Sequence, residues 1–439
     1  MTAHTPTACR LRIVAALAGI ATLLSPLVPA QATPYTRPAE QALLPGKVPA
    51  EGDEEEQAEC SPDVPRLVDE TPAAFSLLGI EKAWDHSDGN VLVAVVDSGV
   101  AAGNAHLTAA VGPGLDLTGG AGEGRVDSFG HGTAIAGQIA ARSVEGSGVK
   151  GLAPKAMILP VKTYVTDAED ADPALRPNDL LNAQGISWAA DQGAKIIVVA
   201  QSSYGDSPEL RAAVKHATSQ GALIVASAGN VPTEKEQEQT DPAQRPDPNA
   251  PRFPAAYPEV LSVTAVDANG APADSVLHGD HIDVAAPGGQ VLTTYLDAGD
   301  CILAGEAPTT SYATGYVGGV AALVAAARPG ETPEDWKYRI VATAFRPSRS
   351  QRDKYVGWGI VAPAEALNFI NDGSMPGPPN PRFPMPEAQE PPRMTPPDHS
   401  QDLRPTRATV LAIVVGTGAL LALATLLISR LRDLRRRRP

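Results

Sequence analysis

Six short apolar segments, separated by longer stretches, constrain the fold of this 439-residue chain more than any other feature. Each has four to seven residues, is almost continuously apolar and is rich in β-branched side chains: Val91–Val96, Met157–Val161, Ile196–Val199, Leu223–Ala226, Val260–Val266 and Ile282–Ala285. Such segments are typical of strands buried on both faces of a parallel sheet.

The stretches between these segments contain apolar residues at helical spacing, notably in Asp179–Gln192, Pro208–Ser219 and Tyr312–Ala327. Strands that alternate with helices predict an α/β fold with a doubly wound parallel sheet, which we place at residues 71–370. The polar segment Val231–Arg252 interrupts the pattern and is long enough to be a functional or mobile surface loop.

Both ends of the chain contain apolar segments of the kind that enter membranes. Arg10 and Arg12 accompany the apolar stretch Leu11–Leu27, which ends at Ala30-Gln31-Ala32. This layout predicts a secretory signal peptide at residues 1–32, and an uncleaved anchor is the alternative.

Near the other end, Ala408–Ser429 contains 22 residues without a charge, enough to span a bilayer as a helix. We predict a transmembrane helix at 407–429 and a basic cytoplasmic tail at 430–439, because that tail has six Arg and one Asp. The expected location is the cell membrane, with a single pass and the main domain extracytoplasmic.

The remaining segments are unusual in composition. Six of the nine residues in Glu51–Glu59 are acidic, which favours a solvated arm at 33–70 over a cation site. Eleven of the 42 Pro lie in Ser374–Pro405, which indicates a stiff linker at 371–406. The net charge of −15 argues against nucleic acid as a partner.

Three motifs contain residues that are weak signals when taken singly. Asp97 directly follows the segment Val91–Val96, His131 lies between two glycines, and Ser311 begins an apolar helical stretch. Alone, the first motif is an ordinary turn and the last an ordinary helix cap. In the order Asp, His, Ser, however, the three match the order of the acyl-transfer triad in subtilisin.

Each residue type suits a step of acyl transfer. Ser311 is the candidate nucleophile, His131 its base, and Asp97 the group that orients and stabilises the imidazole. Asn230, which follows another apolar segment, is the candidate oxyanion-hole residue through its side-chain amide. This chemistry needs no cofactor and no metal, and we expect neither.

On these motifs, the chain resembles the subtilisin-like serine proteases over Thr71–Leu367. Phe253–Pro258, Asp283–Gly288 and Gly357–Val361 also match the family. In the family the position of His106 is structural, so we do not assign it a catalytic role. The resemblance implies that the backbone of substrates pairs with two segments, whose residues are Gln201, Ser202, Ser203, Ala226, Ser227, Ala228 and Gly229.

The layout of signal peptide, arm, linker and C-terminal anchor resembles the mycosins, the membrane-anchored subtilases of type VII secretion systems. This implies a serine endopeptidase that cleaves exported proteins, with the secretion membrane complex as a partner. Two alternatives are a non-catalytic component that stabilises the complex and a general cell-surface subtilase.

The chain departs from the family pattern near the nucleophile, where Thr309 replaces a Gly and Gly315 replaces a Pro. If that Gly has a positive φ, Thr309 strains the turn. Cys60 and Cys301 are the two cysteines outside the signal peptide, which favours a disulfide over a metal site. Two free thiols are the alternative, because the Cys that mycosins often place three residues before the catalytic His is Ser128 here.

Overall fold

The computed structural model describes residues 60–384, except residues 63, 169, 233–246, 248 and 249, together with residues 404–436. The six apolar segments all form strands, as predicted. Their observed bounds are β1 Leu92–Asp97, β3 Met157–Lys162, β4 Ile196–Val199, β5 Leu223–Ser227, β6 Leu261–Val266 and β7 Val284–Pro287.

These strands form one parallel sheet of seven strands in the order β2-β3-β1-β4-β5-β6-β7. The seventh strand, β2 Leu115–Asp116, has only two residues and was not predicted. Neither was a separate antiparallel hairpin of β8 Val291–Thr294 and β9 Asp300–Leu303.

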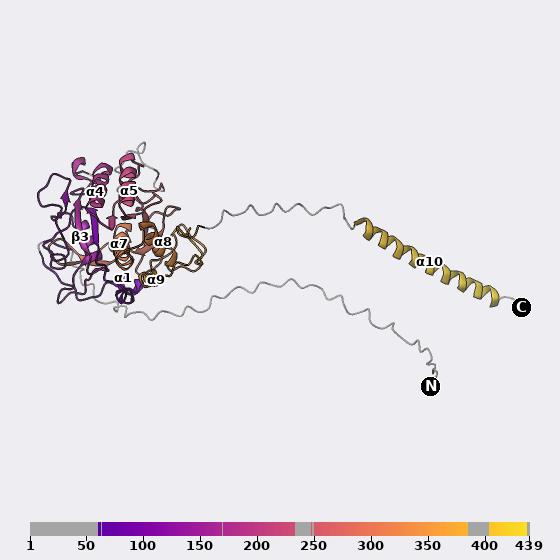
Figure 1. The fold of residues 1–439 in the computed structure, drawn as a ribbon. Helices are drawn as coiled ribbons and strands as arrows, with labels where there is room; N and C mark the ends of the chain where they lie inside the picture. Colours follow the sequence, from indigo (N-terminus) through magenta and orange to yellow (C-terminus); the bar gives the residue numbers. More distant parts are fainter. Residues whose placement is uncertain are drawn as a thin grey trace, which may run out of the picture. The chain divides into compact units, whose positions relative to one another are not determined.

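Alternate residues of the central strands enter two different cores, which explains why their sequences are continuously apolar. In β1, Val93 and Val95 pack with α3 (His131–Ala140) and α7 (Thr310–Ala327). Ala94 and Val96 pack with α4 (Asp179–Asp191) and α5 (Pro208–Ser219). The two layers are visible in Figure 1, where α4 and α5 lie side by side and apart from α7.

The three predicted helices correspond to α4, α5 and α7, so the doubly wound α/β fold is confirmed. Side chains at the starts of α4 and α5 fix those starts: Asn178 accepts from the N–H of Leu181 at 2.9 Å and Ser207 from that of Leu210 at 3.2 Å. The shorter helices are α1 Ala73–Leu78, α2 Ile80–Trp84, the 3₁₀ turn Pro173–Leu175, α8 Pro333–Thr343 and α9 Pro363–Asn368.

The order of the strands places a crevice at the carboxyl end of β1. The chain passes from β1 to β3 on one side and then crosses to β4 on the other, so its direction across the sheet reverses at β1. Ligands of doubly wound sheets bind at such a reversal, outside the carboxyl ends of the strands. Asp97, the last residue of β1, is at that point.

The described parts of the predicted arm and linker both contact the domain. Arg66 pairs with Gly299 as an isolated bridge, and Arg382 binds the carboxylate of Asp335 at 2.7 and 2.8 Å. The segment 371–384, which we assigned to the linker, therefore packs on the domain. The predicted signal peptide, the rest of the arm and linker, and most of the loop 231–252 lie outside the described residues.

The helix α10, Arg404–Arg436, contains the whole segment 407–429. Within the described part of the chain it is the one helix long and apolar enough to cross a membrane, and an 18-residue stretch of it has a mean hydropathy of 2.5.

Candidate active site

Asp97 is fully buried, and one of its oxygens, Oδ1, accepts three hydrogen bonds. The donors are Nδ1 of His131 at 2.8 Å, the backbone N–H of Ser98 at 2.8 Å and the hydroxyl of Tyr164 at 2.9 Å. Burial alone would raise the pKa of Asp97, but the charge and hydrogen bond of His131 outweigh it and lower that pKa. Asp97 is therefore a carboxylate at neutral pH.

His131 is the first residue of α3, and a tight turn before it fixes its position. The carboxylate of Asp127 accepts from the N–H of Gly130 at 2.9 Å and from that of Thr133 at 3.0 Å. Gly130 has a φ of 96°, and a Cβ there would lie 2.8 Å from the ring of Tyr295. Only glycine fits this turn without strain.

The imidazole of His131 is oriented by Asp97. Because Nδ1 donates to that carboxylate, Nε2 is the nitrogen free to accept a proton in the neutral ring. Burial alone would lower the pKa of His131, but the charge and hydrogen bond of Asp97 outweigh it and raise that pKa, with smaller contributions from Asp127 and Asp167.

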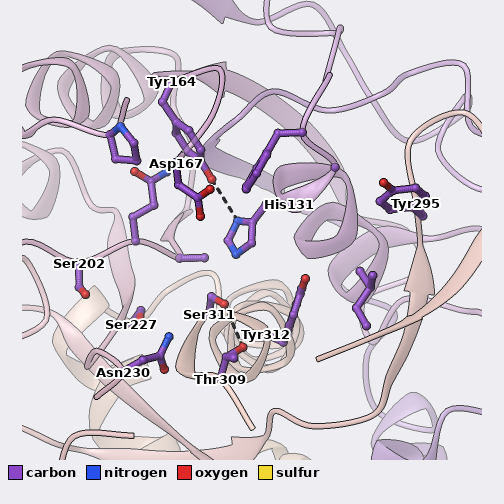
Figure 2. A pocket seen from close by; sticks show the side chains of 16 residues that line it. His131, Tyr164, Asp167, Ser202, Ser227, Asn230, Tyr295, Thr309, Ser311 and Tyr312 are labelled. Carbon is purple, nitrogen blue, oxygen red and sulfur yellow. Dashed lines mark hydrogen bonds between the residues drawn. The ribbon is translucent and has the colours of Figure 1, made fainter. Parts of the chain in front are cut away.

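Ser311 is the second residue of α7 and lines the same cavity as His131, as Figure 2 shows. Its Oγ lies 3.2 Å from Oγ1 of Thr309. Ser311 and His131, both described, do not hydrogen-bond to one another in this structure. Such bonds are often long without substrate and tighten when it binds.

The two departures from the family pattern fit this structure without strain. Thr309 has φ −121° and ψ 144°, an extended conformation that suits threonine, so the expected strain does not arise. A Cβ at Gly315 would lie under 2.5 Å from the buried side chain of Gln138, whose Nε2 donates to the carbonyl of Tyr312 at 2.8 Å. Because Gly315 has no side chain, Gln138 can occupy this space.

Asn230 is held so that the N–H₂ end of its amide is available. Its Oδ1 accepts from the backbone N–H of Thr310 at 2.9 Å and from the hydroxyl of Thr310 at 3.0 Å. The backbone N–H of Ser311, in the first turn of α7, has no acceptor within its helix. These two donors border one cavity and could bind an oxyanion.

The cavity has a volume of about 470 Å³ and is lined by three of the predicted substrate-binding residues, Gln201, Ser202 and Ser227. The N–H and the carbonyl of Ser203 both bond to Phe253 at 2.9 Å, so its backbone is not free for a substrate. The other predicted residues are buried and do not line the cavity: Ala226, Ala228 and Gly229.

Two residues near His131 were missed from the sequence, Tyr164 and Asp167. Both follow the carboxyl end of β3 and line the cavity. The hydroxyl of Tyr164 lies 3.3 Å from Nδ1 of His131, and a dashed line marks this contact in Figure 2. Burial and the charge of Asp97 raise the pKa of Tyr164, so its hydroxyl keeps its proton. Both follow a predicted strand, and this position is the sequence feature that could have indicated them.

His106 and the two cysteines lie away from the cavity. His106 is fully buried, with Nδ1 at 2.6 Å from the carbonyl of Arg142 and Nε2 at 2.8 Å from Asp300, as a structural residue requires. The structure joins Cys60 to Cys301, with their Cα atoms 5.8 Å apart. In the described part of the chain, no group of three or more His, Cys, Asp or Glu is placed to hold a metal ion.

A doubly wound parallel sheet in which a buried Asp binds a His that shares a cavity with a Ser, in the chain order Asp, His, Ser, is the arrangement of the subtilisin-like serine endopeptidases. The Subtilase family model matches residues 88–359, and the chain belongs to this family.

Similar proteins place the chain among the mycosins. Mycosin-1 of Mycolicibacterium smegmatis is 31% identical over 393 residues, which cover 80% of this chain and 84% of that protein. The crystal structure of MycP1 from Mycobacterium smegmatis superposes with a TM-score of 0.59 at 30% identity, over 74% of this chain and 92% of that one. A chain in an intact ESX-5 inner membrane complex gives 0.57 at 28% identity, over 81% and 90%.

Proposed function

We propose that this cavity is the active site of a membrane-anchored endopeptidase in which Ser311 is the nucleophile. The observation that carries the proposal is the 2.8 Å contact of His131 with the buried Asp97, because His131 shares one cavity with Ser311 and Asn230. These groups supply a base of fixed orientation, a hydroxyl and an oxyanion site, which are the requirements of acyl transfer.

In the first half of the reaction, Oγ of Ser311 attacks the carbonyl carbon of the scissile peptide bond while Nε2 of His131 takes the hydroxyl proton. The backbone N–H of Ser311 and the amide of Asn230 bind the negative oxygen that forms. His131 then gives its proton to the leaving amine, which departs and leaves an acyl group on Ser311.

In the second half, His131 takes a proton from a water molecule, which attacks the acyl group. The tetrahedral intermediate then collapses: His131 gives the proton back to the departing Oγ of Ser311, and the carboxyl product is released. The imidazolium that forms twice in this cycle is stabilised by the carboxylate of Asp97. The raised pKa of His131 matches this role, because its cause is the same carboxylate.

The substrates we propose are exported proteins, cleaved outside the cytoplasm by an enzyme held in a type VII secretion membrane complex. The similarity to mycosins and to a chain of the ESX-5 inner membrane complex supports this setting. The apolar helix α10 and the six Arg of 430–439 support a single-pass anchor with a cytoplasmic C-terminus. Extended substrates would lie along Gln201, Ser202 and Ser227.

The test is labelling of the full-length protein in detergent with a serine-directed fluorophosphonate, followed by cleavage of a peptide library. Ser311→Ala should abolish both while the protein still folds. Asn230→Ala should keep some labelling and lose about 100- to 1,000-fold in turnover, the usual cost of one oxyanion donor.

The second candidate is a non-catalytic component that stabilises the secretion complex. It is favoured by one observation, that Ser311 bonds to Thr309 and not to His131. If the unmutated protein neither labels nor cleaves, while loss of the gene still disrupts secretion and the Ser311→Ala variant restores it, this candidate is correct.

A further inference from the structure

The cavity has one carboxylate on its wall, that of Asp167. Apart from His131, the other described lining residues are neutral at pH 7, and none is Lys or Arg. Asp167 is exposed, and it follows the carboxyl end of β3. In Figure 2 it is seen beside Tyr164 and His131, at the part of the cavity where the proton transfers are proposed.

Unlike the neighbouring acids, Asp167 has no side-chain hydrogen bond or ion pair with any residue that the structure describes. Asp97 accepts three hydrogen bonds, and Asp127 is occupied by the turn before α3. Within the described residues no Lys, Arg or His forms an ion pair with Asp167.

Asp167 is also close enough to act electrostatically on the groups of the cavity. Its negative charge contributes to the raised pKa values of His131, Tyr164 and Tyr312, three residues on different elements. A carboxylate on a concave, otherwise neutral wall attracts cations and repels anions.

We propose that Asp167 selects peptides that place a Lys or Arg side chain in this cavity, at one defined position relative to the scissile bond. The inference rests on the proposed function, and it adds the class of substrate. The peptide cation forms an ion pair with Asp167 while the backbone of the peptide lies along Gln201 and Ser202.

The experiment measures kcat/KM of the full-length protein for peptides that carry Lys, norleucine or Glu at each position in turn. Norleucine keeps the length of the Lys side chain and removes its charge. We expect one position at which Lys is preferred over norleucine by about 10-fold, a preference that weakens as salt is added.

Three variants test whether Asp167 causes that preference for Lys. Asp167→Asn should reduce the Lys/norleucine ratio to about one, and Asp167→Lys should favour Glu at the same position. Asp170→Asn is the matched control, because Asp170 is exposed on the same loop and does not line the cavity. It should keep the wild-type ratio, since an exposed charge that does not line the cavity is screened by solvent.

The outcomes separate the inference from the proposed function. If neutral peptides are cleaved and the fluorophosphonate labels, but no position prefers Lys or Asp167→Asn keeps the preference, the inference is overturned. If Asp167→Asn lowers kcat/KM equally for Lys and norleucine peptides, the inference is also overturned. Such a result would mean that Asp167 acts on the pKa of His131 and not on the side chain of the peptide. Absence of both labelling and cleavage overturns the proposed function, and the inference with it.

Discussion

The three donors at Asp97 all bind one oxygen, Oδ1, while Oδ2 is buried and has no hydrogen-bond partner among the described residues. The hydroxyl of Tyr164 therefore shares its acceptor with His131. A donor at this oxygen stabilises the carboxylate and weakens its electrostatic attraction for the imidazolium. Tyr164 thus acts on the reaction through Asp97, as a positioning residue.

Replacing Tyr164 by Phe removes only this hydroxyl. We expect kcat to fall about 10-fold with little change in KM, because the Asp97 carboxylate that orients His131 loses one of the hydrogen bonds that fix its own position, and a hydrogen bond to a charged group contributes about 1.5 to 3 kcal/mol. The acid limb of the pH profile should move to higher pH, since a more basic Asp97 raises the pKa of His131 further. The measurement is kcat and kcat/KM against pH.

Tyr338→Phe is the control for that experiment. Tyr338 is also buried and loses one hydrogen bond, to Asn380 at 3.1 Å, but it lies on α8 and does not line the cavity. An unshifted pH profile in Tyr164→Phe, with a loss of stability like that of Tyr338→Phe, would assign Tyr164 a merely structural role.

Thr309 offers a second test at the level of single residues. Its hydroxyl lies 3.2 Å from that of Ser311, and when Ser311 is the donor this bond must break before Ser311 can give its proton to His131. Thr309→Val keeps the shape and should label with fluorophosphonate about 5-fold faster, because a bond of about 1 kcal/mol no longer opposes the reaction.

The matched control is Thr343→Val, in which a buried threonine of α8 loses a bond to the carbonyl of Arg339. Its labelling rate should stay at the wild-type value. Slower labelling of Thr309→Val would mean that the hydroxyl assists Ser311 and does not restrain it.

Among the elements, the strands of the central sheet were predictable from sequence because both of their faces are buried. The hairpin β8–β9 was not, because its inward residues include Thr293 and Thr294. Their hydroxyls donate to the carbonyls of Ala134 and Thr133 at 2.9 and 2.8 Å, so these polar residues are buried only through contacts with α3. No periodicity in the sequence indicates these contacts of Thr293 and Thr294 with α3.

The residues of the candidate site also divide into those that the sequence predicts and those that it does not. Asp97, His131, Ser311 and Asn230 were found because they sit in motifs at strand ends and helix starts. Tyr164 follows a strand as well, but a tyrosine there can point into a core or into solvent. Its bond to Asp97 depends on side-chain direction, which the sequence does not specify.

The start of β9 joins the N-terminal arm to the domain. Asp300 accepts from the N–H of Val68 at 2.9 Å and the hydroxyl of Ser147 at 2.5 Å, and it pairs with His106 in the interior. The next residue, Cys301, is the one joined to Cys60.

This arrangement predicts a dependence of stability on pH. Burial alone would lower the pKa of His106, but the hydrogen bond and charge of Asp300 raise it above its ordinary 6.5. Burial would raise the pKa of Asp300, yet His106 and Ser147 lower it below 3.8. The contribution of the pair is therefore full between these two ordinary values and is lost above and below them.

The measurement is urea unfolding of the full-length protein at several pH values, with the cysteines oxidised. His106→Gln should cost about 3 to 5 kcal/mol at about pH 5.5 and clearly less at about pH 9. His216→Gln, which breaks an exposed pair with Asp191 at 2.7 Å, should cost under about 1 kcal/mol throughout. A cost for His106→Gln that does not vary with pH would contradict the charged pair.

At the scale of the whole molecule, thiol titration tests whether the arm is covalently attached. Cys60 and Cys301 are the two cysteines that remain if the signal peptide is removed. The unfolded, unreduced mature protein should therefore contain no titratable thiol, and two after reduction. Two thiols before reduction would exclude the bond and leave the arm attached by non-covalent contacts, among them backbone hydrogen bonds with Asp300, Ala298 and Gly148.

The last prediction concerns the orientation of the chain across the membrane. The six Arg of 430–439 follow the apolar segment 407–429 directly, and moving such charges through hydrocarbon is costly. A single cysteine introduced by Arg438→Cys should therefore react with a membrane-impermeant maleimide only after cells are permeabilised. Ser374→Cys, on the other side of the helix in sequence and exposed, should react in intact cells. Reaction of Arg438→Cys in intact cells would reverse the topology and place the candidate active site in the cytoplasm, where exported substrates could be met only before their secretion.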